Sequence, residues 1–398
     1  LSMFLKGTSN SKVSVEIERQ GKLINKELVR EKVVINPVPF YEMIDEETGY
    51  IALTRFNNKA SSKVKKAFKA LKKKGMKKLV FDLRYNPGGS LMESINISNF
   101  FIPKGKVIVT TKAKIKKWSN TYKTSNEPLD LEIPIVVLVN GRSASASEIV
   151  SGSLQDYDRA VIMGQRSFGK GLVQRYRELT YGTQLKVTIS KYYTPSGRCI
   201  QELDYANTDK KGNVPKFSDA GINAFQTANG RTVYDGGGVM PDVETLTSNK
   251  NKTTEELLKS KAIFNFATRY FYENESLENL SDFNFETSDF NKFTAFLKVD
   301  TTFLTEKERL FEKAFLAAKE NKISNAVNEI KENLSEEKLV EISKNKDLIL
   351  EALKAEILER FFYKEGVYQY NLKNDKTISE AFILLNNENK YSKILSGK

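Results

Sequence analysis

Hydrophobic and polar positions follow two different periods in the first 250 residues. Residues 13–34 alternate with a period of two, which predicts a β-hairpin or two sheet strands. Residues 50–86 read as strand, lysine-rich helix and strand, which is a βαβ unit. A second unit follows, with a strand apolar on both faces at 133–139, a helical period at 145–157 and a short buried strand at 160–163. Buried strands that alternate with amphipathic helices indicate an α/β core with a largely parallel sheet.

The pattern of strands ends near residue 250. Before that point, residues 172–194 alternate as an extended hairpin, and a glycine-rich run with one proline follows at 236–243. Beyond residue 249 proline disappears, Glu and Lys dominate, and helical periods recur. The sequence therefore predicts a β-rich segment at 1–35, an α/β core at 36–249 and an all-helical domain at 250–398.

The formal charge of +13 is concentrated in one segment, residues 61–78, which is rich in lysine. Within it Val64, Ala67, Phe68 and Leu71 share one helical face, so we expect a surface helix with its lysines in water. No zinc-finger spacing or RNA-binding signature accompanies these lysines, and no nucleic-acid partner is expected. The charge excess alone does not indicate an anionic partner.

Other composition features narrow the possible classes of protein. No run approaches 18 apolar residues, so no transmembrane segment is expected, and the first residues lack the parts of a signal peptide. The lone Cys199 permits no internal disulfide, and we expect it to pack as a small apolar side chain. The sequence predicts neither a metal nor a cofactor.

The 398 residues include no histidine, which excludes Ser-His-Asp and Cys-His catalysis. Lysine can serve as the base of a serine when burial makes its amine neutral. A serine-rich stretch lies between a buried strand and a helix, where the helix N-terminus stabilises developing negative charge. The pattern does not choose between Ser143, Ser145 and Ser147.

Two glycine-rich turns add candidate groups. The turn at 86–89, Asn-Pro-Gly-Gly, follows a strand of the same sheet, and its amides are placed to join that of Ala146 in an oxyanion hole. Lys170 stands between two glycines, and Gln174, four residues on, is a candidate to orient the amine or the hydroxyl. Considered alone, the turn at 86–89 is typical of an ordinary tight turn, and Lys170 is typical of a solvated lysine in a loop.

Together these motifs resemble those of the C-terminal processing peptidases, also called tail-specific proteases. The resemblance rests on GYIALTRF, DLRYNPGGS, VNGRSASASEIVSGSLQD, FGKGLVQ, YYTPSGRCIQ and GGGVMPDV. It implies that the middle serine, Ser145, is the nucleophile, Lys170 the general base and Gln174 its orienting partner. It further implies an oxyanion hole formed by Gly88 or Gly89 with the Ala146 amide.

The same resemblance implies an architecture and a biological setting. The core would be a protease fold of crotonase/ClpP-like βαβ units, residues 1–35 the C-terminal half of a PDZ-like domain, and 250–398 a helical extension of the kind found in some bacterial members. Substrates would be proteins or peptides with flexible C-termini. The enzyme would be exported, to the periplasm or a membrane surface, and a homo-oligomer is compatible with the resemblance.

Two alternative functions remain open from the sequence. One is an acyl-CoA enzyme of crotonase-like fold, which also uses backbone oxyanion donors but needs an acidic base near the site. The other is a non-catalytic peptide-binding scaffold, since the PDZ-like part is incomplete and the helical domain is large. Turnover of acyl-CoA by a variant that lacks the serine would favour the acyl-CoA enzyme. Failure of a serine-reactive probe to label the folded protein would favour the scaffold.

Overall fold

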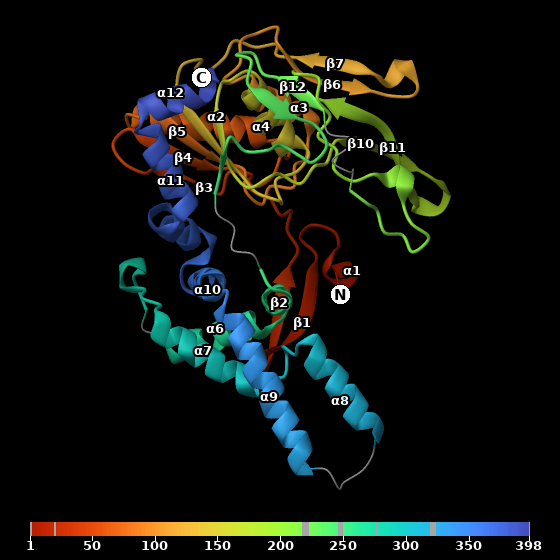
Figure 1. Ribbon diagram of the computed structural model, residues 1–398, viewed down its shortest axis with the longest axis vertical. Helices are drawn as coiled ribbons and strands as arrows, with labels where there is room; N and C mark the ends of the chain where they lie inside the picture. The colour runs from red at the N-terminus through yellow and green to blue at the C-terminus, as the bar shows by residue number, and fades with distance from the viewer. Residues whose placement is uncertain are drawn as a thin grey trace. The chain divides into compact units, whose positions relative to one another are not determined.

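The structure is a computed structural model, shown in Figure 1. It describes residues 2–19, 21–216, 223–245, 250–274, 277–318 and 324–397. The chain divides into two compact units, Leu1–Pro37 and Val38–Lys398. No helix in the described residues is long and apolar enough to cross a membrane.

The first unit is a two-stranded antiparallel hairpin with a short helix before it. Its elements are α1 (Ser2–Leu5), β1 (Lys12–Arg19) and β2 (Lys22–Val29). The hairpin predicted for residues 13–34 is therefore present, but its second strand ends at Val29 rather than at Val34. The Arg30 guanidinium donates to the carbonyl oxygens of Phe4, Leu5 and Lys12, and so ties the start of the unit to the end of the hairpin.

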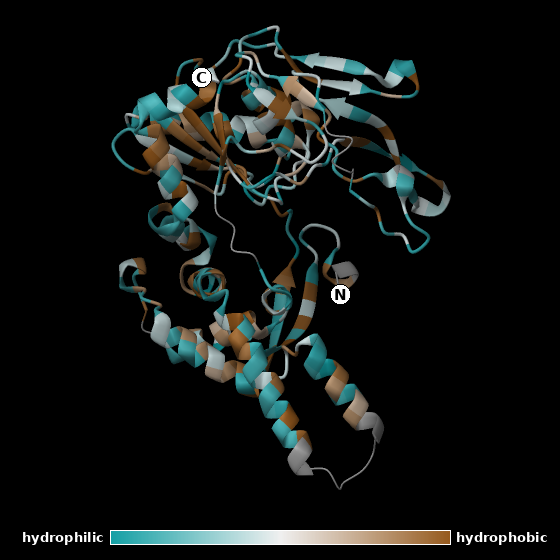
Figure 2. Cartoon of the chain, viewed as in Figure 1, coloured by the Kyte–Doolittle hydropathy of each residue, from teal (hydrophilic) through white to brown (hydrophobic). Residues whose placement is uncertain are grey.

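A six-stranded sheet forms the centre of the second unit, with strand order β14-β9-β8-β5-β4-β3. All neighbouring pairs are parallel except β3 with β4. Figure 2 shows strands of this sheet as a hydrophobic region. The strands are β3 (Phe40–Met43), β4 (Thr48–Ala52), β5 (Lys78–Asp82), β8 (Ile135–Val139), β9 (Val161–Gly164) and β14 (Val243–Glu244).

Both predicted βαβ units are present in this sheet. In the first, α2 (Ala60–Lys73) connects β4 to β5, and its buried residues include Val64, Ala67, Phe68 and Leu71, as the helical period predicted. In the second, α4 (Ala146–Asp156) connects β8 to β9 and is buried along its whole length. The expectation of an α/β core with a largely parallel sheet is confirmed.

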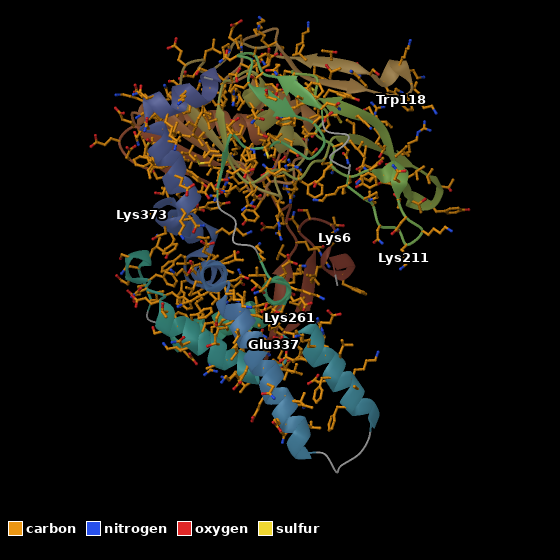
Figure 3. The ribbon with its side chains drawn as sticks, viewed as in Figure 1. Lys6, Trp118, Lys211, Lys261, Glu337 and Lys373 are labelled. Atoms are coloured by element: carbon orange, nitrogen blue, oxygen red, sulfur yellow. The ribbon has the colours of Figure 1, made fainter. Side chains whose placement is uncertain are left out.

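A second, four-stranded antiparallel sheet has the order β10-β11-β6-β7. The hairpin expected at 172–194 is its β10–β11 pair. Figure 3 labels Trp118, which belongs to the short 3-10 turn between β6 and β7. The remaining elements of this region are β6 (Val107–Lys112), β7 (Asn120–Lys123), β10 (Leu172–Glu178), β11 (Gln184–Tyr193), β12 (Ala224–Gln226), β13 (Thr232–Tyr234) and α3 (Leu91–Ser98).

Described residues after 250 are helical, as the sequence predicts. Most of these helices enclose an apolar cluster of their own, rich in phenylalanine, with Phe293 fully buried at its centre. The helices are α5 (Lys252–Lys259), α6 (Ala262–Glu273), α7 (Thr287–Val299), α8 (Glu306–Ala318), α9 (Ser324–Ser343), α10 (Lys346–Asn374), α11 (Lys376–Leu385) and α12 (Glu388–Ser396).

The last two helices belong to the core of the six-stranded sheet. One face of the sheet packs with α2, α3 and α4, whereas the other face packs with α11 and α12. The Tyr391 hydroxyl donates to the Ile135 carbonyl oxygen at 3.0 Å and accepts from the Ile135 amide at 2.9 Å. Because neighbouring strand residues point to opposite faces, a strand apolar on both faces needs a cover on each side. Helices α11 and α12 provide the second cover.

This packing predicts different effects for two isoleucines of α11. Ile378 is 1% exposed in the cluster against the sheet, so Ile378→Ala should lower the free energy of unfolding by about 2–5 kcal/mol. Ile383 is 62% exposed on the same helix, and Ile383→Ala should change it by less than about 0.5 kcal/mol. Urea unfolding followed by circular dichroism measures both. Equal effects would contradict the packing of α11 on the sheet.

Candidate active site

Ser145 occupies a strained turn at the carboxyl end of β8. The strand is fully buried, and a short loop leads from it to Ser145, the residue that precedes the first turn of α4. Its φ of 58° and ψ of −111° lie outside the regions that L-residues favour, which costs of order 1–3 kcal/mol. The turn directs the helix N-terminus, where the Ala146 amide has no acceptor among the described residues, toward the edge of the sheet where the parallel strands end.

The three candidate serines have different surroundings. The Ser143 hydroxyl is buried, donates to the Leu83 carbonyl oxygen at 2.8 Å and accepts from the Asn140 amide. The Ser147 hydroxyl is also buried and donates to the Asn86 carbonyl oxygen at 2.9 Å. Both therefore hold the loop against the neighbouring strand. Only Ser145 of the three is partly exposed.

The glycine turn at 86–89 lies directly against Ser145. A methyl group on Gly88 would lie 2.6 Å from the Ala144 carbonyl oxygen and 2.9 Å from the Ala146 nitrogen, so no larger residue fits. The Gly88 amide donates to the Asn86 side-chain oxygen at 2.9 Å. The amides of Gly89 and Ala146 have no hydrogen-bond acceptor among the described residues. Of the two glycines considered, Gly89 thus has the available donor.

Lys170 lies in a tightly packed loop between β9 and β10, and it is only partly exposed. A methyl group on Gly169 would lie 2.4 Å from Cβ of Glu202, and one on Gly171 would lie 2.8 Å from the Gln201 nitrogen. The Gly171 amide donates to the Gln201 side-chain oxygen at 2.8 Å. The loop is therefore fixed by neighbouring backbone rather than free in solvent.

A buried carboxylate connects the serine turn to the lysine loop. Glu148 is fully buried on the first turn of α4. Its Oε2 accepts from the Ser145 amide at 2.7 Å and from the Lys170 amide at 2.9 Å. Its Oε1 accepts from the Ser167 hydroxyl at 2.6 Å and from the Gly169 amide at 2.7 Å. Because one oxygen binds both amides, the backbone nitrogens of Ser145 and Lys170 cannot be farther apart than the sum of those two distances.

Burial raises the pKa of the Glu148 carboxyl, and its four hydrogen bonds oppose that rise by stabilising the ionised form. Glu148 is not among the residues that the sequence motifs singled out. The signal was present, because a serine followed three residues later by glutamate before an apolar run is the pattern of a capping box. The pattern indicates a helix start, and nothing in it indicates the bond to the Lys170 loop.

Gln174 is on β10, four residues after Lys170, at the point where the register with β11 shifts. Its side chain is partly exposed. Among the described residues, no hydrogen bond joins the Lys170 amine to the Ser145 hydroxyl or to the Gln174 side chain. The structure therefore brings the backbones of Ser145, Gly88 and Lys170 together. Within the described residues, the hydrogen bonds expected among the side chains of Ser145, Lys170 and Gln174 are not formed.

A second buried cluster lies at the end of β5, just before the glycine turn. The Asp82 carboxylate accepts from the Tyr50 hydroxyl at 2.8 Å and from the Arg84 guanidinium at 2.7 Å. The same guanidinium donates to Asp375 at 2.8 Å, and Asp375 caps the N-terminus of α11. Burial, followed by the Asp82 charge, raises the pKa of Tyr50 well above its ordinary value. This cluster connects the strand before the turn to the C-terminal helices.

Comparison with protein families matches two parts of the chain. Residues 47–207 match the family described as Peptidase family S41. Residues 253–385 match the family described as Probable PDZ-protease, C-terminal helical domain. The first match includes every candidate catalytic residue.

Individual relatives carry related names. A probable CtpA-like serine protease of Staphylococcus aureus is 33% identical over 298 residues, which are 74% of this chain and 58% of that protein. A carboxyl-terminal-processing protease of Synechocystis is 35% identical over 204 residues, 50% of this chain and 47% of that protein. This chain thus spans about half the length of these relatives. A solved photosystem II D1 C-terminal processing protease aligns with a TM-score of 0.40 and 29% identity, over 60% of this chain and 56% of that one.

The Glu148 bonds predict that Glu148→Gln disables the site. A carboxamide carries an N–H₂ group, which would face backbone donors where the carboxylate now presents an acceptor. We expect a loss of about 1–3 kcal/mol in the free energy of unfolding, and a loss of activity larger than this stability change explains. Urea unfolding and peptide cleavage, measured on the same preparation well below the unfolding transition, separate the two effects.

Glu93→Gln is the matched control, since Glu93 is only partly buried and its carboxylate accepts the Ser61 amide rather than an amide of Ser145 or Lys170. Full activity of a folded Glu148→Gln variant would show that the shared carboxylate does not position the two segments.

Proposed function

We propose that this chain, whose residues 47–207 match peptidase family S41, is a serine endopeptidase that uses Ser145 and Lys170 to cleave proteins near their C-termini. One observation carries the assignment of residues. The Glu148 Oε2 atom accepts the backbone amides of both Ser145 and Lys170, so the proposed nucleophile and base share one anchor. The family model also spans both residues.

The proposed chemistry begins with attack of the Ser145 hydroxyl oxygen on the scissile carbonyl carbon, while the neutral Lys170 amine takes the hydroxyl proton. The tetrahedral oxyanion would accept from the Gly89 and Ala146 amides, which have no other acceptor among the described residues. The Lys170 ammonium then gives its proton to the leaving amine. Water attacks the acyl-enzyme, with Lys170 again as base, and restores the serine. Gln174 would orient the lysine amine.

Gly88 has a supporting part in this proposal. Its own amide is bound to Asn86, and its missing side chain leaves room for the Ser145 turn. The positive end of the α4 dipole adds to the stabilisation of the oxyanion. The strain at Ser145 is consistent with such a role, because strained backbone persists where the surroundings hold it in place.

The finer features of the architecture are part of the same proposal. We assign the core to the crotonase/ClpP-like arrangement of βαβ units, and the β1–β2 hairpin to part of a PDZ domain. The match of residues 253–385 to a helical domain of PDZ-proteases supports the second assignment. Substrates would be proteins with flexible C-termini. Neither the acyl-CoA alternative nor the scaffold alternative is favoured by an observation in the structure.

Ser145→Ala should abolish hydrolysis and leave the fold intact. Loss of a helix-start hydroxyl costs about 1 kcal/mol or less, whereas loss of the nucleophile lowers kcat by at least about a thousandfold. The measurement is mass spectrometry of the product termini released from a disordered protein. Ser62→Ala, an exposed serine on α2, is the control and should keep full activity. Cleavage by Ser145→Ala at the same bonds would refute the assignment.

Lys170→Arg should be as inactive as Lys170→Ala. A guanidinium keeps its proton at any usable pH and cannot accept one from a hydroxyl, so retained charge does not rescue the base. Steady-state kinetics with a fluorogenic peptide measures this, with Lys69→Arg on the exposed face of α2 as the control. If Lys170→Arg kept a tenth or more of the wild-type rate, Lys170 would have an electrostatic role rather than that of a base.

A further inference from the structure

Tyr85 stands in a backbone conformation that its residue type disfavours. It lies between the partly buried Arg84 and the glycine turn, with a φ of 60°. Glycine and asparagine adopt this left-handed conformation readily, whereas for a bulky residue it is an outlier. The Tyr85 side chain is nevertheless 66% exposed, so burial of the ring does not compensate the strain. An exposed aromatic ring held in this way beside a candidate active site indicates a role in contact with something outside the chain.

A buried asparagine holds Tyr85 beside an arginine. The Asn140 side-chain oxygen accepts from the Tyr85 amide at 3.0 Å and from the Arg142 amide at 3.1 Å. Asn140 is 7% exposed, and its own amide donates to the Ser143 hydroxyl. The Arg142 guanidinium lies 5.8 Å from the centre of the Tyr85 ring, within the range of a cation–π contact. One buried group thus fixes both backbones, and the ring supports the cation.

The guanidinium of Arg142 is available for a ligand. Arg142 is exposed, and it forms no ion pair with any carboxylate of the described residues. Two more exposed arginines, Arg55 and Arg166, follow β4 and β9 at the same edge of the sheet, because the carboxyl ends of parallel strands share an edge. Of the carboxylates at this edge, Asp82 and Glu148 are buried and already bound, whereas Glu244, which ends β14, is exposed. Arg142, three residues before Ser145, therefore remains a cation without a carboxylate partner among the described residues.

The distance along the chain limits what Arg142 can reach. Arg142 precedes Ser145 by three residues, so their Cα atoms are at most about 11 Å apart. An extended peptide covers this in roughly three residues. A group bound by Arg142 thus lies a few residues from the bond that Ser145 attacks. Arginine binds carboxylates through its planar set of donors.

We propose that Tyr85 and Arg142 form a subsite that binds a carboxylate of the substrate a few residues from the scissile bond. The C-terminal carboxylate and the side chain of Asp or Glu share this chemistry, and the peptides described below distinguish them. This inference rests on the proposed function of the same site, and it adds a determinant of where cleavage occurs. Tyr85 supplies the face on which the guanidinium rests, and Arg142 binds the anion.

The test uses four peptides that share one sequence except at the C-terminal residue, which is the third after the cleaved bond. Two of them end in alanine, one with a free C-terminal carboxylate and one with a C-terminal amide. The other two end in an amide, one with glutamate and one with glutamine as the last residue. For the wild type we expect kcat/KM to be about fivefold higher for the peptides with a carboxylate at this distance, as an exposed ion pair gives. A preference for the free acid alone would assign the subsite to the C-terminus, and a preference for glutamate alone to an acidic side chain.

Arg142→Gln should bring the ratio between charged and neutral peptides close to one. Tyr85→Asn, which suits the left-handed backbone, should reduce the ratio without lowering the melting temperature, whereas Tyr85→Phe should retain it. Arg269→Gln, an exposed arginine of α6 paired with Glu273, is the control and should keep the wild-type ratio. An unchanged ratio in Arg142→Gln, or equal rates for all four peptides in the wild type, would overturn the subsite. Absence of any Ser145-dependent cleavage would instead overturn the proposed function.

Discussion

A carboxylate buried away from the solvent has to be surrounded by hydrogen-bond donors, and that requirement shapes the candidate active site. Desolvation of an isolated ionised carboxyl costs several kcal/mol, so Glu148 is tolerable only because four donors converge on it. These donors come from the serine turn and from the lysine loop. The loop bends closely enough to reach the carboxylate because glycines flank Lys170, and Gly169 adopts a φ of 81°. The position of each segment therefore depends on the other.

The same principle operates at the end of β5. The Arg84 guanidinium binds both the Asp82 and the Asp375 carboxylates next to the glycine turn. Removing this guanidinium would leave two carboxylates without their shared cation, which is more destabilising than the net worth of either pair. The turn that offers the Gly89 amide is thus supported by polar groups from the far end of the chain.

Local patterns predicted most of the core, because strands and helices differ in period. The alternation near residue 13, the apolar run of β8 and the helical face of α2 depend only on neighbours in the sequence. Contacts between segments that are far apart in the sequence produce no periodic pattern of this kind. The helical period of α11 indicates that one of its faces is apolar, but it does not indicate that this face covers β8. The serine at position 145 was chosen by family resemblance, since only a three-dimensional structure shows that Ser143 and Ser147 bind backbone oxygens.

The cover formed by α11 and α12 has a consequence for the order of folding during synthesis. A ribosome makes the strands β4, β5 and β8 long before it makes the helices that bury their second face. Chains generally begin to fold from the N-terminal side as they emerge. This sheet therefore remains half uncovered, with its Arg84 lacking Asp375, until residues near 375–396 have been translated. A nascent chain interrupted before that point would expose an apolar sheet face suited to chaperone binding or aggregation rather than a finished active site.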